Sequence, residues 1–130
     1  QRASRIAKMW GVLPGMFLDL TVEDPDDGME WDFTSSLKRD KAERLIADGK
    51  TMLVIGSAMC SALKQLQSIE SKENPDAVKE QKLDDARRHL EFCCKLYRMH
   101  MEQGMYFLHE HPEKALSWEE PSVKALLSDY

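Results

Sequence analysis

Three features are scarce or missing in this chain of 130 residues, and each absence narrows what the protein can be. No stretch approaches the roughly 18 uncharged apolar residues that a membrane-spanning helix requires, so no span is expected. An excess of positive charge is also missing, because 18 Lys and Arg stand against 23 Asp and Glu and the net charge is -5. This balance disfavours nonspecific coating of nucleic acid, although a local site for nucleic acid is compatible with it.

Cysteine is the third scarce residue. The three cysteines, of which Cys93 and Cys94 are adjacent, do not form the even, spaced framework of a small secreted domain. We therefore expect an intracellular, reducing compartment. The length predicts a single domain over residues 1–130, with residues 1–15 as an N-terminal extension. The chain begins at Gln1 without an apolar signal segment, which indicates either processing or a piece of a longer chain.

Short apolar runs alternate with helix-spaced segments along the chain. Three runs are typical of strands, at residues 16–22, 51–55 and 105–108. Apolar spacing and capping residues predict a first helix that ends near Trp10, and further helices over residues 35–48, 59–69, 75–103 and from Pro121 onward. This alternation predicts an α/β fold in three layers, with a small, mostly parallel sheet of about three strands between flanking helices.

Polar side chains follow each expected strand at the point where it ends. In a parallel sheet the carboxyl ends of the strands share one edge, and ligands bind outside that edge. Because consecutive residues of a strand alternate in direction, Glu110 is expected to point away from its two histidine neighbours. The residues predicted to converge are Asp19 and Thr21 after the first strand, Ser57 and Cys60 after the second, and His109, Glu110 and His111 after the third.

Each of these residues has a chemical and a structural interpretation. A thiolate at Cys60, at the start of a helix, would be stabilised by the helix dipole and would be a nucleophile, whereas a buried small side chain explains the same position. A carboxyl at Glu110 beside an apolar strand can share a proton with a substrate nitrogen, or it can cap a strand end. Trp31 and Trp118 either wall a pocket or pack. The histidines lack a recognised zinc spacing, so no metal site is predicted.

The motifs at the three strand ends resemble those of the cytosine-5 DNA methyltransferases, and of methyltransferase-like segments beside retroelement polyproteins in eukaryotic genomes. The resemblance spans residues 16–118 and keeps the family's order of motifs. Asp19-Leu20-Thr21 is similar to an Asp-Ile-Thr strand end, Gly56-Ser57-Ala58-Met59-Cys60 to a Gly-x-Pro-Cys or Ser-Pro-Pro-Cys loop, Phe107-Leu108-His109-Glu110-His111-Pro112 to a strand that ends in Glu-Asn, and Ser117-Trp118 to a Ser-x-x-Trp tail.

This resemblance implies a Rossmann-like methyltransferase fold with S-adenosylmethionine as cofactor. Asp19 and Thr21 would contact the cofactor, with Asp19 near its adenine. Cys60 would attack C6 of a cytosine flipped out of its duplex, and Glu110 would hold the N3 edge of that base. Ser57, His109 and His111 would bind the substrate.

The chain also departs from the family. Met59 replaces the proline before the cysteine, His111 replaces the asparagine after the glutamate, and no Gly-x-Gly follows any expected strand. The first hypothesis is therefore a methyltransferase-like domain, either degenerate and inactive in isolation or half of a longer chain. The alternative is a noncatalytic structural or interaction subunit, in which a protein partner completes the sheet and covers its Met-rich and aromatic surface. A small redox or metal protein that uses Cys60 and histidine is a third interpretation.

Overall fold

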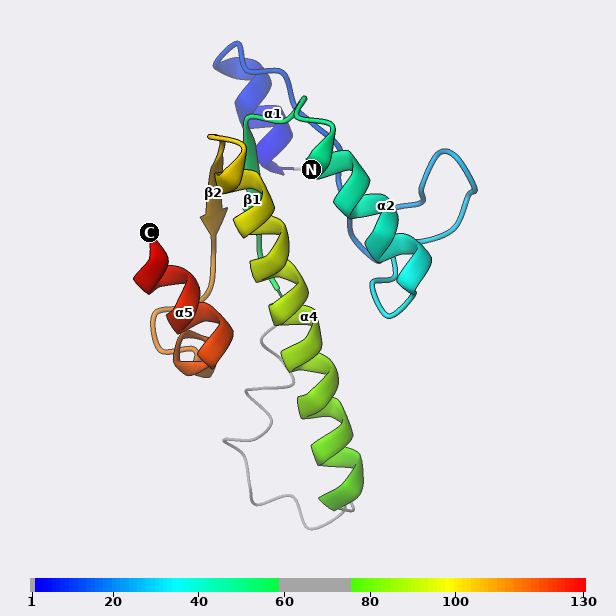
Figure 1. The fold of residues 1–130 in the computed structure, drawn as a ribbon. Helices are drawn as coiled ribbons and strands as arrows, with labels where there is room; N and C mark the ends of the chain where they lie inside the picture. Colours follow the sequence, from blue (N-terminus) through cyan, green and yellow to red (C-terminus); the bar gives the residue numbers. More distant parts are fainter. Residues whose placement is uncertain (1, 59–75) are drawn as a thin grey trace. The chain divides into compact units, whose positions relative to one another are not determined.

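The structure is a computed structural model that describes residues 2–58 and 76–130 (Figure 1). Its contacts divide the chain into two compact units, Gln1–Arg44 and Leu45–Tyr130, and each is described by itself. The elements in chain order are α1 (Arg2–Met9), α2 (Ser36–Ala47), β1 (Leu53–Gly56), α4 (Asp76–Glu102), β2 (Tyr106–His109), a 3-10 helix η1 (Leu116–Glu119) and α5 (Pro121–Asp129). No helix among these residues is long and apolar enough to cross a membrane.

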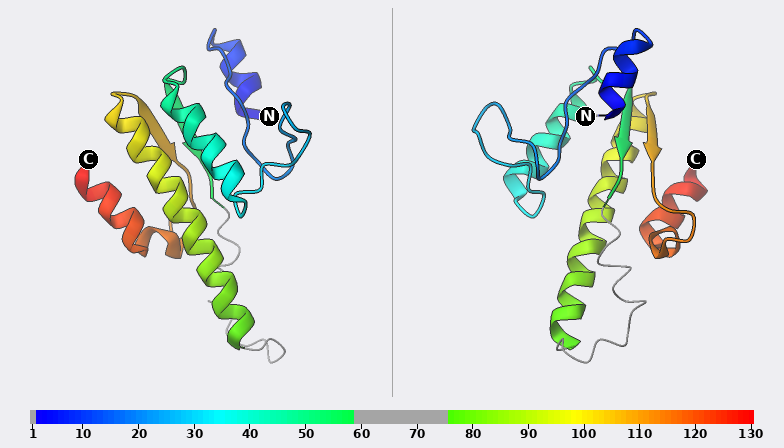
Figure 2. Two further views of the ribbon diagram at one scale, coloured as in Figure 1. Left: turned by 45° about the vertical axis from the view of Figure 1, so that its right-hand side comes forward. Right: turned by 180° about the vertical axis from the view of Figure 1, so that it is seen from behind.

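The second unit is built on two parallel strands. Figure 1 shows β1 and β2 beside α4. Leu53 of β1 lies opposite Tyr106 of β2, and Gly56 lies opposite His109. The long helix α4 connects the strands in sequence and packs against both of them, and α5 packs against α4 (Figure 2). The described part of the chain is therefore a mixed α/β fold in which the sheet has two strands rather than the expected three.

The core of this unit lies between α4, α5 and the inner face of the sheet. One apolar face of α4 meets the side chains that α5 and the end of β1 turn inward, as its helical spacing predicts. The buried residues of this cluster are Ala58, Leu90, Cys94, Tyr97, Val123 and Leu126, with Val54, Cys93, Phe107 and Trp118 packed against them. Cys93 and Cys94 are thus core thiols, and burial raises the pKa of Cys93 to about 12.

Local sequence signals explain where these helices begin and end. Gly49 and Gly104 have φ angles of 70° and 75° and follow the C-terminal turns of α2 and α4, where a left-handed residue suits glycine. Pro121 occupies the first turn of α5, where the missing amide hydrogen costs nothing. These three boundaries were expected from the sequence and are confirmed.

The expected strand at residues 16–22 is wrong. Asp19 Oδ1 accepts hydrogen bonds from the amide of Thr21 at 2.8 Å and from its hydroxyl at 2.7 Å. The amide of Val22 donates to the carbonyl of Asp19 at 2.9 Å, so the chain turns at this point. An aspartate two residues before a threonine favours such a turn, and this local preference outweighed the apolar run. Phe17 and Leu20 are left exposed.

The first unit is organised around a buried carboxylate. Asp24 is fully buried, and its oxygens accept hydrogen bonds from Lys38 and Lys41 of α2, each at 2.7 Å. Both ammonium groups also lie over the ring of Trp31, 4.9 and 5.4 Å from its centre, and Trp31 is buried. The tryptophan therefore packs within this ion cluster, which is one of the two interpretations given for it.

Candidate functional site

Ser57 and Glu110 meet where the two parallel strands end. The Ser57 hydroxyl donates a hydrogen bond to Glu110 Oε2 at 3.0 Å, and the Glu110 amide donates to the carbonyl of Gly56 at 2.9 Å. Both side chains are exposed. The register accounts for the pair, because Gly56 and His109 are partners and each is followed by one of the two residues. A hydroxyl and a carboxylate are thus presented together at the edge where parallel sheets bind ligands.

His109 points to the opposite side, into the protein. The Tyr97 hydroxyl lies 2.8 Å from its Nδ1. Burial lowers the pKa of His109 to about 4, with a contribution from neighbouring His111, whereas burial raises the pKa of Tyr97 above its ordinary value. A neutral imidazole and a protonated phenol follow, so Tyr97 donates and Nδ1 accepts. The imidazole proton is then on Nε2, which is buried and has no hydrogen-bond partner among the described residues.

Gly56 makes room for Tyr97. A Cβ added to Gly56 would lie 1.6 Å from the phenol oxygen and 2.6 Å from Cζ. The tyrosine ring is stacked on Phe107, with ring centres 4.7 Å apart, and is buried. A glycine inside a strand often marks such a close approach. That signal was present in the sequence, although it does not say which side chain approaches. Tyr97 falls within the helix expected over residues 75–103, which by itself gives it no role at the strand end.

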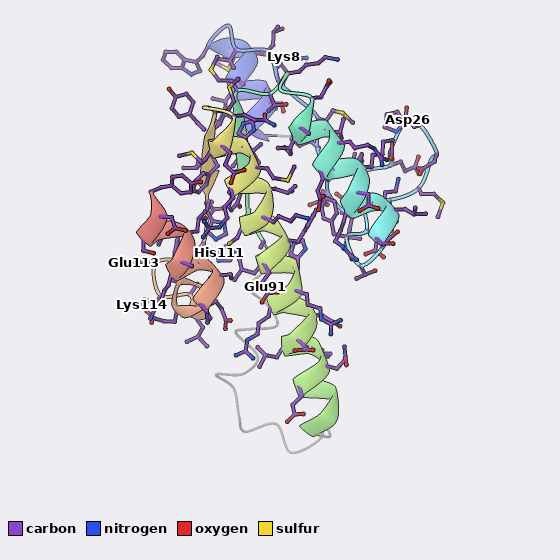
Figure 3. All side chains as sticks on the ribbon, in the orientation of Figure 1. Lys8, Asp26, Glu91, His111, Glu113 and Lys114 are labelled. Carbon is purple, nitrogen blue, oxygen red and sulfur yellow. The ribbon has the colours of Figure 1, made fainter. Side chains whose placement is uncertain are left out.

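His111 joins two segments that are distant in the sequence. Its Nε2 donates to the Ala58 carbonyl at 2.6 Å, and its Nδ1 accepts a hydrogen bond from the Ser117 hydroxyl. Ser117 is fully buried, and Figure 3 shows His111 on the inner side of its loop while Glu113 and Lys114 lie outside. The imidazole therefore links Ala58, which lies just after β1, to Ser117 of η1.

The two imidazoles and Trp118 form one aromatic cluster behind the Ser57–Glu110 pair. The ring centres of His109 and His111 are 4.3 Å apart. Trp118 meets both rings edge-on, at 5.3 and 6.1 Å, and its Nε1 donates to the carbonyl of Pro112 at 2.8 Å. The expected alternation is confirmed: the histidines lie together on the inner side, and the carboxylate lies on the other.

Three further predicted site residues are Asp19, Thr21 and Cys60. Asp19 and Thr21 belong to the first unit, where hydrogen bonds from Thr21 to the carboxylate lower the pKa of Asp19. Cys60 and the predicted helix over residues 59–69 lie outside the described residues.

The described residues do not fit a site for S-adenosylmethionine. A nucleoside cofactor is ordinarily held where glycines let the backbone approach it closely. The space beside Gly56 is already filled by Tyr97, and a Cβ at Gly15 would meet nothing within 4 Å, so neither glycine marks a close approach to a cofactor. The carboxylate of Asp19, expected at the adenine, is instead held in a local turn by Thr21. Within residues 2–58 and 76–130, no group of three or more acidic, His or Cys side chains is arranged to hold a metal ion.

Comparison with protein-family models, with curated proteins and with solved structures gives no match to this chain. Function is therefore inferred from the strand ends. At these strand ends the exposed Ser57 hydroxyl is hydrogen-bonded to the Glu110 carboxylate. On the inner side of the same strand end, His109 and His111 are partly buried and hydrogen-bonded.

Proposed function

We propose that this chain is a methyltransferase-like domain that handles a pyrimidine base of nucleic acid, with Glu110 as the base-binding carboxyl and Cys60 as the nucleophile. The Ser57–Glu110 hydrogen bond of 3.0 Å is the observation that carries this proposal. This hydrogen bond forms because β1 and β2 are adjacent and parallel. Residues 57–58, which precede Cys60 in the sequence, and Glu110 therefore follow the two strands at the same edge of the sheet. The sequence resemblance implies the same pairing of a cysteine loop with a glutamate strand end.

The proposed chemistry is addition of a thiolate to the base. The Cys60 sulfur forms a bond to C6, the electrons of the C5–C6 double bond move through the ring toward N3, and N3 receives a proton from the Glu110 carboxyl. This proton transfer is ordinary general acid catalysis. The hydrogen bond from Ser57 holds Oε2, so Oε1 is the carboxyl oxygen available to the base.

A mechanism-based probe tests this step without a methyl donor. A single-stranded oligonucleotide that carries 2-pyrimidinone, whose C6 is more electrophilic than that of cytosine, should form an adduct that survives denaturation and maps to Cys60 by mass spectrometry. Cys60→Ser should abolish the adduct. Glu110→Gln should slow its formation by about a hundredfold, because a general acid contributes at least that factor.

Two matched variants control this experiment. Glu113→Gln removes an exposed carboxyl three residues away, and Cys93→Ser removes a core thiol whose pKa is raised to about 12. Both should leave the rate of adduct formation within about twofold of the unmodified protein, since neither alters the strand ends. Absence of an adduct with the folded protein, or equal rates with Glu110→Gln and with Glu113→Gln, would contradict the proposed function. Calorimetric titration with S-adenosylmethionine separately tests the cofactor role that the resemblance implies for Asp19 and Thr21. We expect no heat of binding, because the Asp19 carboxylate is held in a local turn by Thr21.

One observation favours the noncatalytic alternative. The outer face of the sheet is apolar, with Leu53, Ile55, Tyr106 and Leu108 each about half exposed or more, at 47%, 54%, 63% and 53%. Parallel sheets are ordinarily covered on both faces. A subunit that docks in a larger assembly through this face should form dimers or larger species in sedimentation experiments, and Ile55→Lys should dissociate them. A monomer that binds no apolar dye would argue against this alternative.

A further inference from the structure

The stretch of residues 2–16 combines positive charge with exposed apolar side chains. Its charged residues are all basic, namely Arg2, Arg5 and Lys8, and the first acidic residue of the chain is Asp19. The chain as a whole has a net charge of -5, so this stretch has the opposite sign from the rest. Its exposed large apolar side chains are Ile6, Met9, Trp10, Val12, Leu13 and Met16. Single exposed apolar residues are ordinary, but a run of this kind marks an interaction surface.

The two kinds of side chain lie on different faces of α1. Arg5 and Lys8 are three residues apart and share one face of the helix. Ile6 and Trp10 are four residues apart and share another, and the amide of Trp10 donates to the carbonyl of Ile6 at 3.2 Å, so the helical turn includes Trp10. Because a helix turns once in about 3.6 residues, the basic pair and the apolar pair lie on roughly opposite sides of it.

The apolar residues continue past the end of α1 through a capped turn. Gly11 has a φ angle of 72°, and its amide donates to the carbonyl of Lys8 at 3.1 Å. The amide of Val12 donates to the carbonyl of Ala7 at 2.9 Å. This is the Schellman arrangement, in which a left-handed glycine satisfies the last carbonyls of a helix. Leu13 directly follows this turn and is 93% exposed, so a defined backbone presents it to the surroundings.

An anionic lipid surface is the partner whose chemistry matches both features. Arg5 and Lys8 are exposed, and neither has an ion-pair partner among the residues that the structure describes. Their charge is therefore available to anionic headgroups, and each Lys or Arg near such a surface strengthens binding about fivefold. Apolar side chains beside them enter the boundary between headgroups and acyl chains, where tryptophan is favoured. Nucleic acid would use the charge, but its phosphates offer no place for an aliphatic side chain such as Leu13.

We propose that residues 2–16 bind the surface of an anionic lipid bilayer. Arg5 and Lys8 face the headgroups, Trp10 lies at their level, and Leu13 enters the boundary of the acyl chains. The binding is to the surface and does not cross the bilayer. It belongs to the first unit, whereas the base chemistry belongs to strand ends of the second unit, so each can fail without the other.

Sedimentation of the full chain with lipid vesicles tests the role of charge. Vesicles of equal parts phosphatidylcholine and phosphatidylserine should bind the chain at least about tenfold more tightly than vesicles of phosphatidylcholine alone. Arg5→Gln combined with Lys8→Gln should weaken binding to the mixed vesicles about thirtyfold. The matched control combines Lys82→Gln with Lys114→Gln, which are exposed positions of the second unit and change the net charge equally. That variant should bind within about twofold of the unmodified protein.

Further variants test the apolar contact. Leu13→Ser should weaken binding to the mixed vesicles at least about tenfold, the factor expected for one leucine returned to water. Leu37→Ser changes another exposed leucine of the first unit and should bind like the unmodified protein. Trp10 is 80% exposed whereas Trp31 is 1% exposed, so tryptophan emission should shift to shorter wavelength on binding. Trp10→Phe should remove this shift while binding persists.

Three outcomes would overturn the proposal. The first is no binding to the mixed vesicles, or equal binding to both kinds of vesicle. The second is an equal loss of binding in the two double variants, which would trace the effect to net charge rather than to residues 2–16. The third is absence of vesicle binding together with either binding of a single-stranded oligonucleotide or self-association that Leu13→Ser abolishes. Those results would assign this stretch to nucleic acid or to a second copy of the chain.

Discussion

Replacing Gly56 by alanine is expected to destabilise the second unit by about 3 kcal/mol, near the upper end for an overpacked core. The new Cβ would lie 1.6 Å from the Tyr97 oxygen. A side chain that ends at the surface would move aside, but Tyr97 is buried, stacked on Phe107 and hydrogen-bonded to His109. Denaturant unfolding followed by circular dichroism measures the loss.

Gly15→Ala is the matched control for this substitution. Gly15 does not have a positive φ, and a Cβ there meets nothing within 4 Å. Its free energy of unfolding should change by no more than about 0.5 kcal/mol, as is usual for a surface substitution. Combining Gly56→Ala with Tyr97→Leu should cost less than the sum of the single changes, because the shorter side chain removes the clashing atoms. A stable Gly56→Ala protein with unchanged tyrosine packing would show that the close approach is wrong.

Replacing Asp24 by asparagine should loosen the first unit more than any other single acidic substitution there. The change removes the buried carboxylate that pairs with Lys38, which is itself only 7% exposed. Removing one member of a buried ion pair is strongly destabilising, because the remaining charge stays buried. Amide exchange over residues 22–44 should rise at least about tenfold. Asp40→Asn, an exposed position on the same helix, is the control and should change exchange little.

The same carboxylate makes the first unit sensitive to acid. Burial disfavours the charged form of Asp24, but hydrogen bonds from Lys38 and Lys41 outweigh it and hold its pKa below the usual range. A carboxyl whose pKa is lower in the folded than in the unfolded chain stabilises the fold above its unfolded pKa, near 4, and loses that contribution as the pH falls further. Amide protection of residues 22–44 should therefore decline below about pH 4, and this decline should be much smaller in Asp24→Asn. Equal pH dependence in both proteins would exclude Asp24 as its cause.

The helices and their ends were predictable because their signals are local. Gly104 ends α4 and Pro121 begins α5 through backbone preferences that act within a turn or two of the chain. The two strands were predictable as short apolar runs, although β1 begins at Leu53 rather than at residue 51. The strand expected at residues 16–22 failed because an apolar run does not identify its partner, and an aspartate-centred turn competed with it.

The candidate site was predicted in part. Alternation along a strand is enough to place Glu110 on one side and the two histidines on the other, and parallel pairing is enough to bring it next to Ser57. The roles of the histidines were not predictable, because a sequence pattern shows which residues are polar but not which partners satisfy them. Tyr97 and Ser117 reach the imidazoles from α4 and η1, and only packing decides that.

The sequence by itself determined the two strands that form, their parallel pairing, the polar residues at their ends and the ends of the described helices, because these follow from short-range geometry and from the spacing of apolar residues. Tertiary structure alone decided that Tyr97 occupies the space left by Gly56, that His111 is bound at both nitrogens, and that Asp24 is buried between two lysines. Each of these is a contact between segments far apart in the chain, and its energy depends on burial that no local pattern specifies.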